Sequence, residues 1–212
     1  MFITRIIEEK KSKFNGDLRV VKTLGMGTYI QADGLTQSGG IVETIWKNTV
    51  RRIKKEFSSP ENVLILGLGG GTVAKLIKNV YPDTKITGIE IDPIMVELGK
   101  KYLNMNETEM EIRIVDAEEY VSQLSISNSK SKFDLIIIDL YNGYQFPQKF
   151  ETENFLHLAR TVLAKNGLMV FNRLYFGDKR PETVKFGKKL EKTFSKVEWF
   201  YPEANLLFLC SK

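Results

Sequence analysis

The stretch VLILGLGGGTVAK, residues 63–75, decides the fold of this 212-residue chain. Four apolar residues typical of a buried strand run into a turn that contains Gly67, Gly69, Gly70 and Gly71, and a helical pattern follows. Glycine at the end of a strand lets the backbone approach another group closely, and the N–H groups of the next helix favour electronegative atoms. Either a ligand or close packing could require such a turn, and signals elsewhere in the sequence are needed to distinguish the two explanations.

Strand and helix patterns alternate along most of the chain. Runs of apolar residues predict strands at 63–66, 85–89, 111–115, 135–139 and 168–171, with helical patterns between them. This alternation predicts an α/β fold with a doubly wound, Rossmann-like, mostly parallel sheet. The end of the chain, KVEWFYPEANLLFLCSK, reads as two adjacent strands without a helix between them, which predicts an antiparallel last strand.

The first part of the chain has a different pattern. Residues 15–34 alternate apolar and polar positions around a glycine-containing turn, which predicts a β-hairpin or short meander. From Ile41 to Phe57 the apolar residues follow a helical period. We therefore predict a small N-terminal β subdomain over residues 1–40 and a Rossmann-like domain over 41–212. The polar run SISNSKSK, residues 125–132, predicts a surface loop.

Composition narrows the function classes. The formal net charge is +5, carried in short basic groups that could contact nucleic acid, although solvated helix faces produce the same pattern. With a single cysteine, Cys210, the chain can form neither an intramolecular disulfide framework nor a cysteine-cluster metal site. The single histidine, His157, has no cluster of ligands around it in the sequence, which disfavours a metal site. No apolar run is long enough to span a bilayer, and the start of the chain becomes charged too soon for a signal peptide. We expect a cytoplasmic protein with no membrane contact, and nucleic acid is disfavoured as a partner.

Acidic residues follow the strands after the glycine turn. Glu90 lies about 20 residues beyond the glycines at the tip of the next strand, where a carboxylate can accept hydrogen bonds from both ribose hydroxyls. Asp116 follows the third strand, within reach of an adenine amino group, and Asp139 follows the fourth at the centre of the crevice. Asp92 or Asp116 could instead be helix N-caps. Because the glycines do not match the dinucleotide fingerprint, a single nucleoside is favoured over a pyrophosphate.

Taken together, these motifs resemble the class I S-adenosylmethionine-dependent transferases and, within them, the spermidine synthases, which are aminopropyltransferases of polyamine synthesis. The stretches that bear the resemblance are ADGLTQS (32–38), ILGLGGGTVAK (65–75), GIEIDP (88–93), VDAEEY (115–120), DLIIIDLYNGY (134–144) and the final FYPEANLLFLCSK (200–212). The resemblance implies S-adenosylmethionine or its decarboxylated form as donor, a small-molecule acceptor that is an amine, no metal, and a homodimer.

The resemblance also implies roles for individual residues. Asp139 would receive a proton from the attacking amine, Glu90 would hold the ribose, and the glycines would pass beneath the methionine-like part of the donor. The implied donor site consists of Gln37, Gly67, Gly69, Gly70, Gly71, Glu90, Ile91, Asp116, Ala117 and Asp139. Candidates for lining an acceptor pocket are Trp46, Tyr141, Asn142, Tyr144 and Tyr201.

The chain departs from the family pattern at acidic positions. Gly70 stands where the family has an aspartate that meets the donor's amine, and Asn142 stands where a second acid binds the diamine. After TQS the chain has Trp46, Lys47 and Asn48 where the family commonly has an aromatic residue, a polar residue and a glutamate. Two lost charge-assisted contacts predict a loss of a hundredfold or more in diamine use. They also predict that S-adenosylmethionine binds at least as well as its decarboxylated form.

Four functions remain open from the sequence. The main interpretation is a transferase that moves a methyl or related alkyl group from S-adenosylmethionine or an analogue to an unidentified small acceptor. The first alternative is a true spermidine synthase whose diamine is held by other groups, such as Glu43 or Glu203. A nucleotide-binding regulatory protein without turnover is the alternative of another class. A nucleic-acid methyltransferase is less favoured, because DLYNGY lacks the Pro-Pro-aromatic run of base amino methylation.

Overall fold

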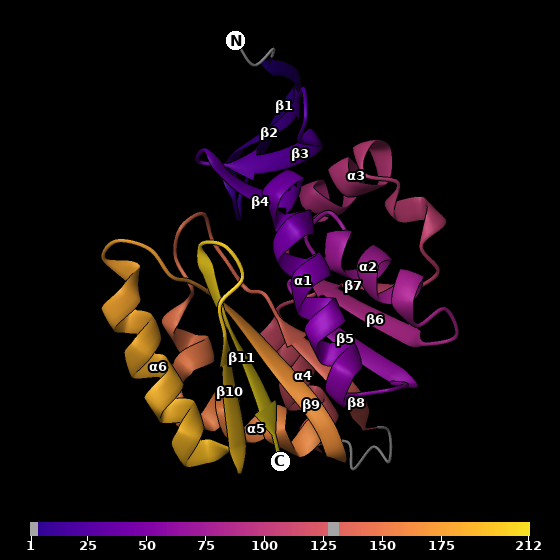
Figure 1. Ribbon diagram of the computed structural model, residues 1–212. Helices are drawn as coiled ribbons and strands as arrows, with labels where there is room; N and C mark the ends of the chain where they lie inside the picture. Colours follow the sequence, from indigo (N-terminus) through magenta and orange to yellow (C-terminus); the bar gives the residue numbers. More distant parts are fainter. Residues whose placement is uncertain (1–3, 127–131) are drawn as a thin grey trace.

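Two separate β-sheets organise the computed structural model, which describes residues 4–126 and 132–212 (Figure 1). The first is an antiparallel meander in which each strand pairs with the next one along the chain. Its strands are β1 (Thr4–Ser12), β2 (Gly16–Thr23), β3 (Gly27–Ala32) and β4 (Leu35–Gly39). The hairpin predicted over 15–34 is thus part of a larger sheet. β1 was not predicted, because most of its residues are polar and exposed and no alternating buried positions mark it as a strand.

The second sheet has seven described strands in the order β10-β11-β9-β8-β5-β6-β7. In chain order these are β5 (Asn62–Leu66), β6 (Lys85–Glu90), β7 (Glu111–Ile114), β8 (Phe133–Ile138), β9 (Leu163–Leu174), β10 (Lys196–Phe200) and β11 (Asn205–Ser211). Strands β5 to β9 run parallel, and β11 pairs antiparallel with both β9 and β10. The predicted α/β sheet with an antiparallel last strand is confirmed. β9 is longer than the predicted 168–171. Its start was not predicted, because Lys165 and Asn166 are polar and exposed.

Within the described residues, six α-helices cover the two faces of this sheet (Figure 1). One face carries α1 (Gly40–Glu56), α2 (Thr72–Val80) and α3 (Pro93–Tyr102), and the other carries α4 (Ala117–Ile126), α5 (Glu153–Val162) and α6 (Lys179–Thr193). Short 3-10 helices, η1 (Met105–Glu107) and η2 (Gln148–Glu151), follow α3 and precede α5. The helix predicted from Ile41 is α1, which ends where Phe57 takes an extended conformation.

Each face of the seven-stranded sheet packs against its helices in a separate cluster of buried side chains. Towards α4, α5 and α6 the cluster is rich in aromatic residues such as Phe155, Phe171 and Phe186. Towards α1 and α2 it consists mostly of aliphatic residues around the fully buried Trp46. Cys210 lies in the first cluster without exposure, and burial raises the pKa of its thiol. The cysteine is therefore a core residue.

The four-stranded sheet packs on α3 and on the glycine turn after β5, at the top of Figure 1. Ser38 Oγ accepts a hydrogen bond from the Gly70 N–H at 2.7 Å, and Thr72 Oγ1 accepts one from the Gly39 N–H at 2.8 Å. The buried contacts with α3 join Leu18, Val20, Ile30 and Ala32 to Met95 and Leu98. The end of β4 is thereby fixed to the turn that begins α2.

Two sequence predictions stay outside what the structure decides. The domain boundary predicted near residue 40 coincides with the end of β4 and the start of α1, but the division into two domains stays a prediction. Of the loop predicted over 125–132, the first two residues, Ser125 and Ile126, end α4, and residues 127–131 lie outside the described residues.

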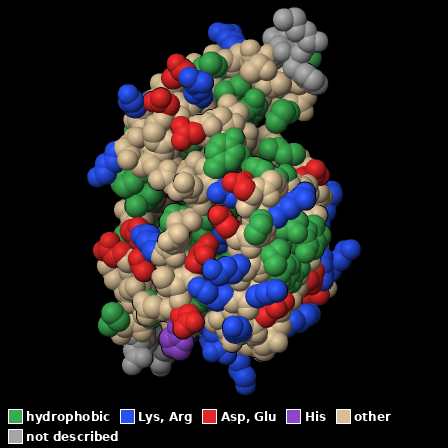
Figure 2. Space-filling model, turned by 90° about the vertical axis from the view of Figure 1, so that its left-hand side faces the viewer, with side chains coloured by type: hydrophobic (Ala, Val, Ile, Leu, Met, Phe, Trp, Pro, Cys, Tyr) green, Lys and Arg blue, Asp and Glu red, His purple; other side chains and the backbone are tan. Residues whose placement is uncertain are grey.

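The surface is mixed in charge. Figure 2 shows lysine and arginine side chains interspersed with acidic ones on the face that carries α6. Several of these charges are paired, as in Arg173 with Glu151 and Lys179 with Glu182. Among the helices in the described ranges, none combines the length and the apolar character needed to cross a membrane.

Candidate functional site

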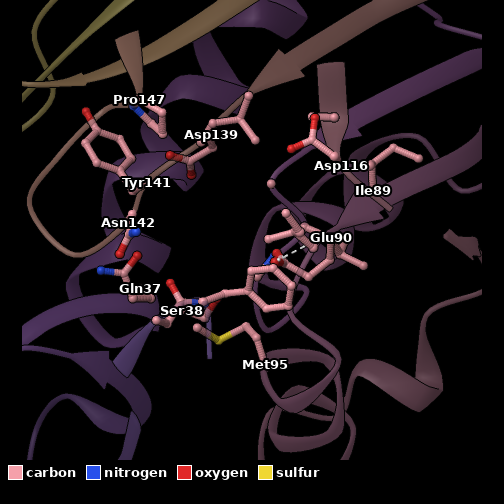
Figure 3. A pocket seen from close by; sticks show the side chains of 18 of the residues that line it. Gln37, Ser38, Ile89, Glu90, Met95, Asp116, Asp139, Tyr141, Asn142 and Pro147 are labelled. Carbon is pink, nitrogen blue, oxygen red and sulfur yellow. Dashed lines mark hydrogen bonds between the residues drawn. The ribbon is translucent and has the colours of Figure 1, made fainter. Parts of the chain in front are cut away.

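A cavity of about 230 Å³ opens where the sheet changes its winding direction. β5, β6 and β7 succeed one another towards one edge of the sheet, and β8 and β9 lie on the other side of β5. The cavity lies at the carboxyl ends of β5 to β8, where doubly wound sheets bind ligands. Residues from β4, from the glycine turn and from the segments after β6, β7 and β8 line it (Figure 3).

Most of the predicted site residues meet at this cavity. Those that line it are Gln37, Gly67, Gly69, Glu90, Ile91, Asp116, Ala117, Asp139, Tyr141 and Asn142. We call the part around Glu90 and Asp116 the Glu90 end, and the part around Asp139, Gln37 and Asn142 the Asp139 end; Figure 3 shows the two parts on opposite sides. The predicted residues that do not line the cavity are Gly70, Gly71, Trp46, Tyr144 and Tyr201.

The glycine turn brings backbone segments into close contact. Gly67 has a φ of +86°, and a Cβ at this position would lie 2.1 Å from the carbonyl oxygen of Asp139. A Cβ at Gly70 would meet side-chain carbons of Leu103 and Ser38 at 2.8 and 2.9 Å. Gly70 is thus packed against the neighbouring elements rather than facing the cavity. Close packing alone requires glycine at these two positions, and only Gly67 also borders the cavity.

Glu90, the last residue of β6, is 8% exposed and holds the glycine turn in place. One carboxylate oxygen accepts a hydrogen bond from the Gly69 N–H at 2.8 Å. The other accepts from the N–H groups of Ile91 and Asp92 at 2.9 and 3.0 Å. Burial raises the pKa of Glu90 above its ordinary value, although these three hydrogen bonds act in the opposite direction. Three of the four acceptor positions of this carboxylate are thus occupied, and the oxygen that accepts from Gly69 keeps one that a ligand hydroxyl can use.

Asp116 caps α4 and pairs with a lysine that sequence analysis missed. Its Oδ1 accepts from the Glu118 N–H at 2.8 Å, and its Oδ2 lies 2.5 Å from Lys149 Nζ. Although burial alone would raise the pKa of Asp116, the bond from Lys149 and those from the backbone N–H groups hold it below the ordinary value. Lys149 belongs to η2 and has no sequence motif around it. Asp116 is therefore both a helix cap and part of the cavity wall.

Asp139 directly follows β8 and is held by side chains from two other elements. Trp46 of α1 donates its indole Nε1–H to Oδ2 at 2.9 Å, and Asn172 of β9 donates its Nδ2–H to Oδ1 at 2.7 Å. Burial raises the pKa of Asp139 to about 6, while these two hydrogen bonds act to lower it. A carboxylate with this pKa is ionised at neutral pH and still basic enough to accept a proton.

The segment after Asp139 closes this end of the cavity. Tyr141 lines the cavity and fixes itself to β9, because its hydroxyl accepts from the Leu174 N–H at 2.7 Å and donates to the Asn172 carbonyl at 3.3 Å. Gln37 Nε2 lies 3.5 Å from the Gly143 carbonyl oxygen. Asn142 forms a short bridge with Gln145 and keeps its side chain exposed. β4 and this segment therefore meet beside Asp139.

Two predicted aromatic residues lie away from the cavity. Tyr144 is 41% exposed, and Tyr201 is 54% exposed with its ring 5.4 Å from that of Tyr175. Trp46 is fully buried and reaches the site only through its hydrogen bond to Asp139. Trp46 is thus a support of the site, whereas Tyr144 and Tyr201 contact neither Asp139 nor the cavity.

The turn between β1 and β2 supplies a wall that sequence analysis missed. Phe14 and Asn15 line the cavity, and Asp92 Oδ2 fixes the turn by accepting from Ser12 Oγ at 2.5 Å and Asn15 Nδ2 at 2.7 Å. The same Asp92 caps α3 by accepting from the Ile94 N–H at 2.9 Å. The one sequence signal is a phenylalanine inside an otherwise polar turn. Further lining residues that were not predicted include Ser38, Val42, Leu68, Thr72, Met95, Pro147 and Phe150.

The charges that face the cavity are mostly negative. Glu90, Asp116 and Asp139 line it, and Lys149 is the one lysine or arginine in the lining contributed by residues 4–126 and 132–212. Lys149 lies at the Glu90 end, paired with Asp116. In the same described ranges no group of three or more His, Cys, Asp or Glu side chains is arranged to hold a metal ion. The cavity therefore presents mainly negative charge to a ligand at its Asp139 end.

Comparison with known proteins connects this geometry to a family. A model described as the spermine/spermidine synthase domain matches residues 43–202. A polyamine aminopropyltransferase of Vibrio vulnificus is 30% identical over 114 residues, which cover 53% of this chain and 38% of that protein. The chain thus spans well under half the length of this curated relative.

Two solved structures share the fold. One is a spermidine synthase in complex with the transition-state analogue AdoDATO, with a TM-score of 0.79 and 22% identity over 98% of this chain and 74% of that chain. The other is human methyltransferase-like protein 13 in complex with SAH, with a TM-score of 0.64 and 21% identity over 80% of this chain and 79% of that chain. At these identities the likeness is one of fold.

Proposed function

Because this chain belongs to the spermine/spermidine synthase family, we propose that it transfers the aminopropyl group of decarboxylated S-adenosylmethionine to an amine acceptor. This was the alternative rather than the main interpretation of the sequence. The family match and the aminopropyltransferase among the relatives favour it over methyl transfer.

The distribution of charge in the cavity supports this donor. The decarboxylated donor ends in an ammonium group, whereas S-adenosylmethionine ends in an ammonium and a carboxylate. Asp139 is the ionised side chain at the Asp139 end, and the cation in the described lining, Lys149, is paired with Asp116 at the other end. A donor carboxylate would be desolvated near Asp139 without a cation to pair with.

From the sequence, S-adenosylmethionine was expected to bind at least as well as its decarboxylated form, because Gly70 stands where the family has an aspartate. Gly70 packs against Leu103 and Ser38 outside the cavity lining, so its lack of a carboxylate has little bearing on the charge that a donor meets.

Each residue of the site has a role in the proposed reaction. The free acceptor position of Glu90 would take a ribose hydroxyl, and Asp116 with Ala117 would meet the adenine. The acceptor nitrogen forms a bond to the aminopropyl carbon as that carbon's bond to sulfur breaks, and the thioether leaves. Asp139 accepts the proton that the nitrogen loses, which its pKa of about 6 permits. The enzyme otherwise acts by holding donor and acceptor in line.

Methyl transfer is the second candidate. The likeness in fold to a methyltransferase structure that contains SAH favours it, as does the exposed amide of Asn142 where the family has an acid. An amine acceptor, a homodimer and a cytoplasmic location stay predictions. Putrescine as a poor acceptor also stays a prediction.

Titration calorimetry with the two donors tests the proposal. We expect the decarboxylated donor to bind about tenfold more tightly than S-adenosylmethionine, because the carboxylate of S-adenosylmethionine would be repelled by Asp139. In the Asp139→Asn variant the difference should shrink, since Asp139 provides the charge that discriminates. Tighter binding of S-adenosylmethionine would favour methyl transfer. Absence of binding for every adenosyl compound would exclude both candidates.

A further inference from the structure

A chain of two buried asparagines runs from Asp139 to the last strand of the sheet. Asn172 of β9 and Asn205 of β11 are each 6% exposed. Asn205 donates its Nδ2–H to Asn172 Oδ1 at 2.7 Å, and Asn172 donates its Nδ2–H to Asp139 Oδ1 at 2.7 Å. Neither asparagine lines the cavity.

The two asparagines lie on the same side of the sheet. Asn172 is the register partner of Leu207, and Asn205 lies two residues before Leu207 on β11, so their side chains point the same way. Leu207 belongs to the buried cluster around Trp46, which approaches Asp139 from α1. Asn172 and Asn205 are thus polar residues in an otherwise aliphatic layer.

An asparagine amide can face a neighbour with either its oxygen or its nitrogen, and the two choices have opposite effects on a carboxylate. If Asn172 presented its oxygen to Asp139, two acceptors would face each other. The donor on Asn205 occupies the Asn172 oxygen and so directs the Asn172 nitrogen towards Asp139. Two apolar residues would fill the same layer without the cost of burying amides. The two asparagines therefore contribute more to the orientation of Asp139 than to the packing of this layer.

We propose that Asn205 is a positioning residue for Asp139, acting through Asn172. With Trp46 on the other carboxylate oxygen, the pair holds Asp139 in one orientation with both oxygens bonded to neutral donors. The value of this arrangement for proton transfer rests on the proposed function, whereas the positioning itself can be measured without turnover.

The neighbours of Asp139 make this effect separable. The titratable side chain that faces it from the following segment is Tyr141, whose hydroxyl pKa is itself raised by burial. Arg173, next to Asn172 on β9, stacks between Phe146 and Phe186 and acts on the Tyr141 hydroxyl, but it is not among the groups that shift the pKa of Asp139. From α1 the contact is the neutral Trp46. Changes at Asn205 therefore reach Asp139 through Asn172 rather than through another charge.

The test is a double-mutant cycle on the titration of Asp139 in the ligand-free protein. The probe is the side-chain carboxyl ¹³C shift of labelled aspartate, assigned with Asp139→Asn. We expect Asn172→Ala to move the midpoint upward by about one pH unit, because a hydrogen bond to the charged form is lost. Asn205→Ala should move it in the same direction by less, since Asn172 can then adopt both orientations. In the Asn172→Ala background, Asn205→Ala should add nothing.

Two further variants keep the test decisive. Asn205→Leu removes the donor but fills the space, so it serves if the alanine variant does not fold. Thr183→Val is the matched control, because it deletes another buried hydrogen bond to β9, from Thr183 Oγ1 to the Leu174 carbonyl, with little change in shape. This control should lower stability and leave the Asp139 titration unchanged. The proposal is overturned if the Asn205 variants leave the midpoint unchanged, or if their effect persists without Asn172.

Discussion

The two ends of the cavity are built in different ways. At the Glu90 end the carboxylate is bound by backbone N–H groups of Gly69, Ile91 and Asp92, which come from adjacent turns at the strand ends. At the Asp139 end the carboxylate is bound by side chains of Trp46 and Asn172, which lie far from it in the sequence. The first end follows from local chain geometry. The second depends on the packing of α1, β9 and β11 around one acid.

Substitutions elsewhere in the chain should therefore affect the two acids differently. The backbone donors at Glu90 need only the course of the chain through these turns, so a substitution elsewhere leaves them in place. The side-chain donors at Asp139 depend on the residues at positions 46 and 172, so single substitutions there can change the surroundings of this acid.

The largest expected effect comes from removing the charge at the Asp139 end. Asp139→Asn keeps the shape but removes the proton acceptor, so turnover should fall roughly 100-fold or more while donor affinity changes much less. Steady-state rates with the decarboxylated donor, together with calorimetry, measure both quantities. Asp134→Asn is the control, an acid near the other end of β8 that caps the backbone of residues 61 and 62. Equal turnover in the native protein and in Asp139→Asn would reduce Asp139 to a structural residue.

The same acid should make folding stability depend on pH. Its pKa in the folded protein, about 6, is above the ordinary value of 3.8, so its contribution to stability is full below pH 3.8 and is lost as the pH rises through 6. Asparagine does not titrate. Between pH 4 and pH 8 the free energy of unfolding of the native protein should therefore fall by up to about 3 kcal/mol relative to that of Asp139→Asn. Urea unfolding at several pH values measures this, and a constant difference would contradict the raised pKa.

At the Glu90 end we expect an effect on binding rather than on turnover. Glu90→Ala removes the acceptor for the ribose and leaves three backbone N–H groups without their partner, so donor affinity should weaken by about 1.5 to 3 kcal/mol. Calorimetry with an adenosyl compound measures the loss. Glu111→Ala, which changes an exposed acid at the other end of β7, should bind like the native protein. Unchanged affinity in Glu90→Ala would place the nucleoside elsewhere.

A smaller effect is expected from restoring an acid beside the acceptor. Asn142→Asp should improve the use of putrescine by up to about fivefold, because a new ion pair there is exposed to solvent. This is less than the hundredfold or more expected from sequence, which counted two lost charge-assisted contacts rather than one exposed pair. The ratio of kcat/KM values for putrescine in the two proteins measures it. A decrease on adding the acid would show that the diamine does not approach Asn142.

The sequence predicted the Glu90 end better than the Asp139 end, because the first is formed by residues close together in the chain and the second by residues far apart. Strand, glycine turn and acid follow one another within a short stretch, so their spacing places Glu90 beside the glycines. The support of Asp139 by Asn172, and of Asn172 by Asn205, arises from strand pairing that no local pattern reports. Phe14 and Lys149 were missed for this reason too, since each reaches the cavity through tertiary contacts.

The fold shows the same division. The parallel strands were predicted because buried strands have continuous apolar runs, whereas β1 was missed because an exposed edge strand has no such signal. The glycines illustrate a limit of a different kind. Their number predicted close approach, and the structure assigns part of that approach to packing, at Gly67 against Asp139 and at Gly70 against Ser38.

Product analysis tests the central claim most directly. The purified chain is incubated with decarboxylated S-adenosylmethionine or with S-adenosylmethionine and a panel of amines, and the products are identified by mass spectrometry. We expect an amine that has gained an aminopropyl group, together with 5′-methylthioadenosine, from the decarboxylated donor, and both products in roughly 100-fold lower yield or less with Asp139→Asn. A methylated amine and S-adenosylhomocysteine as the faster products, or no product from either donor, would contradict aminopropyl transfer as the function of this chain.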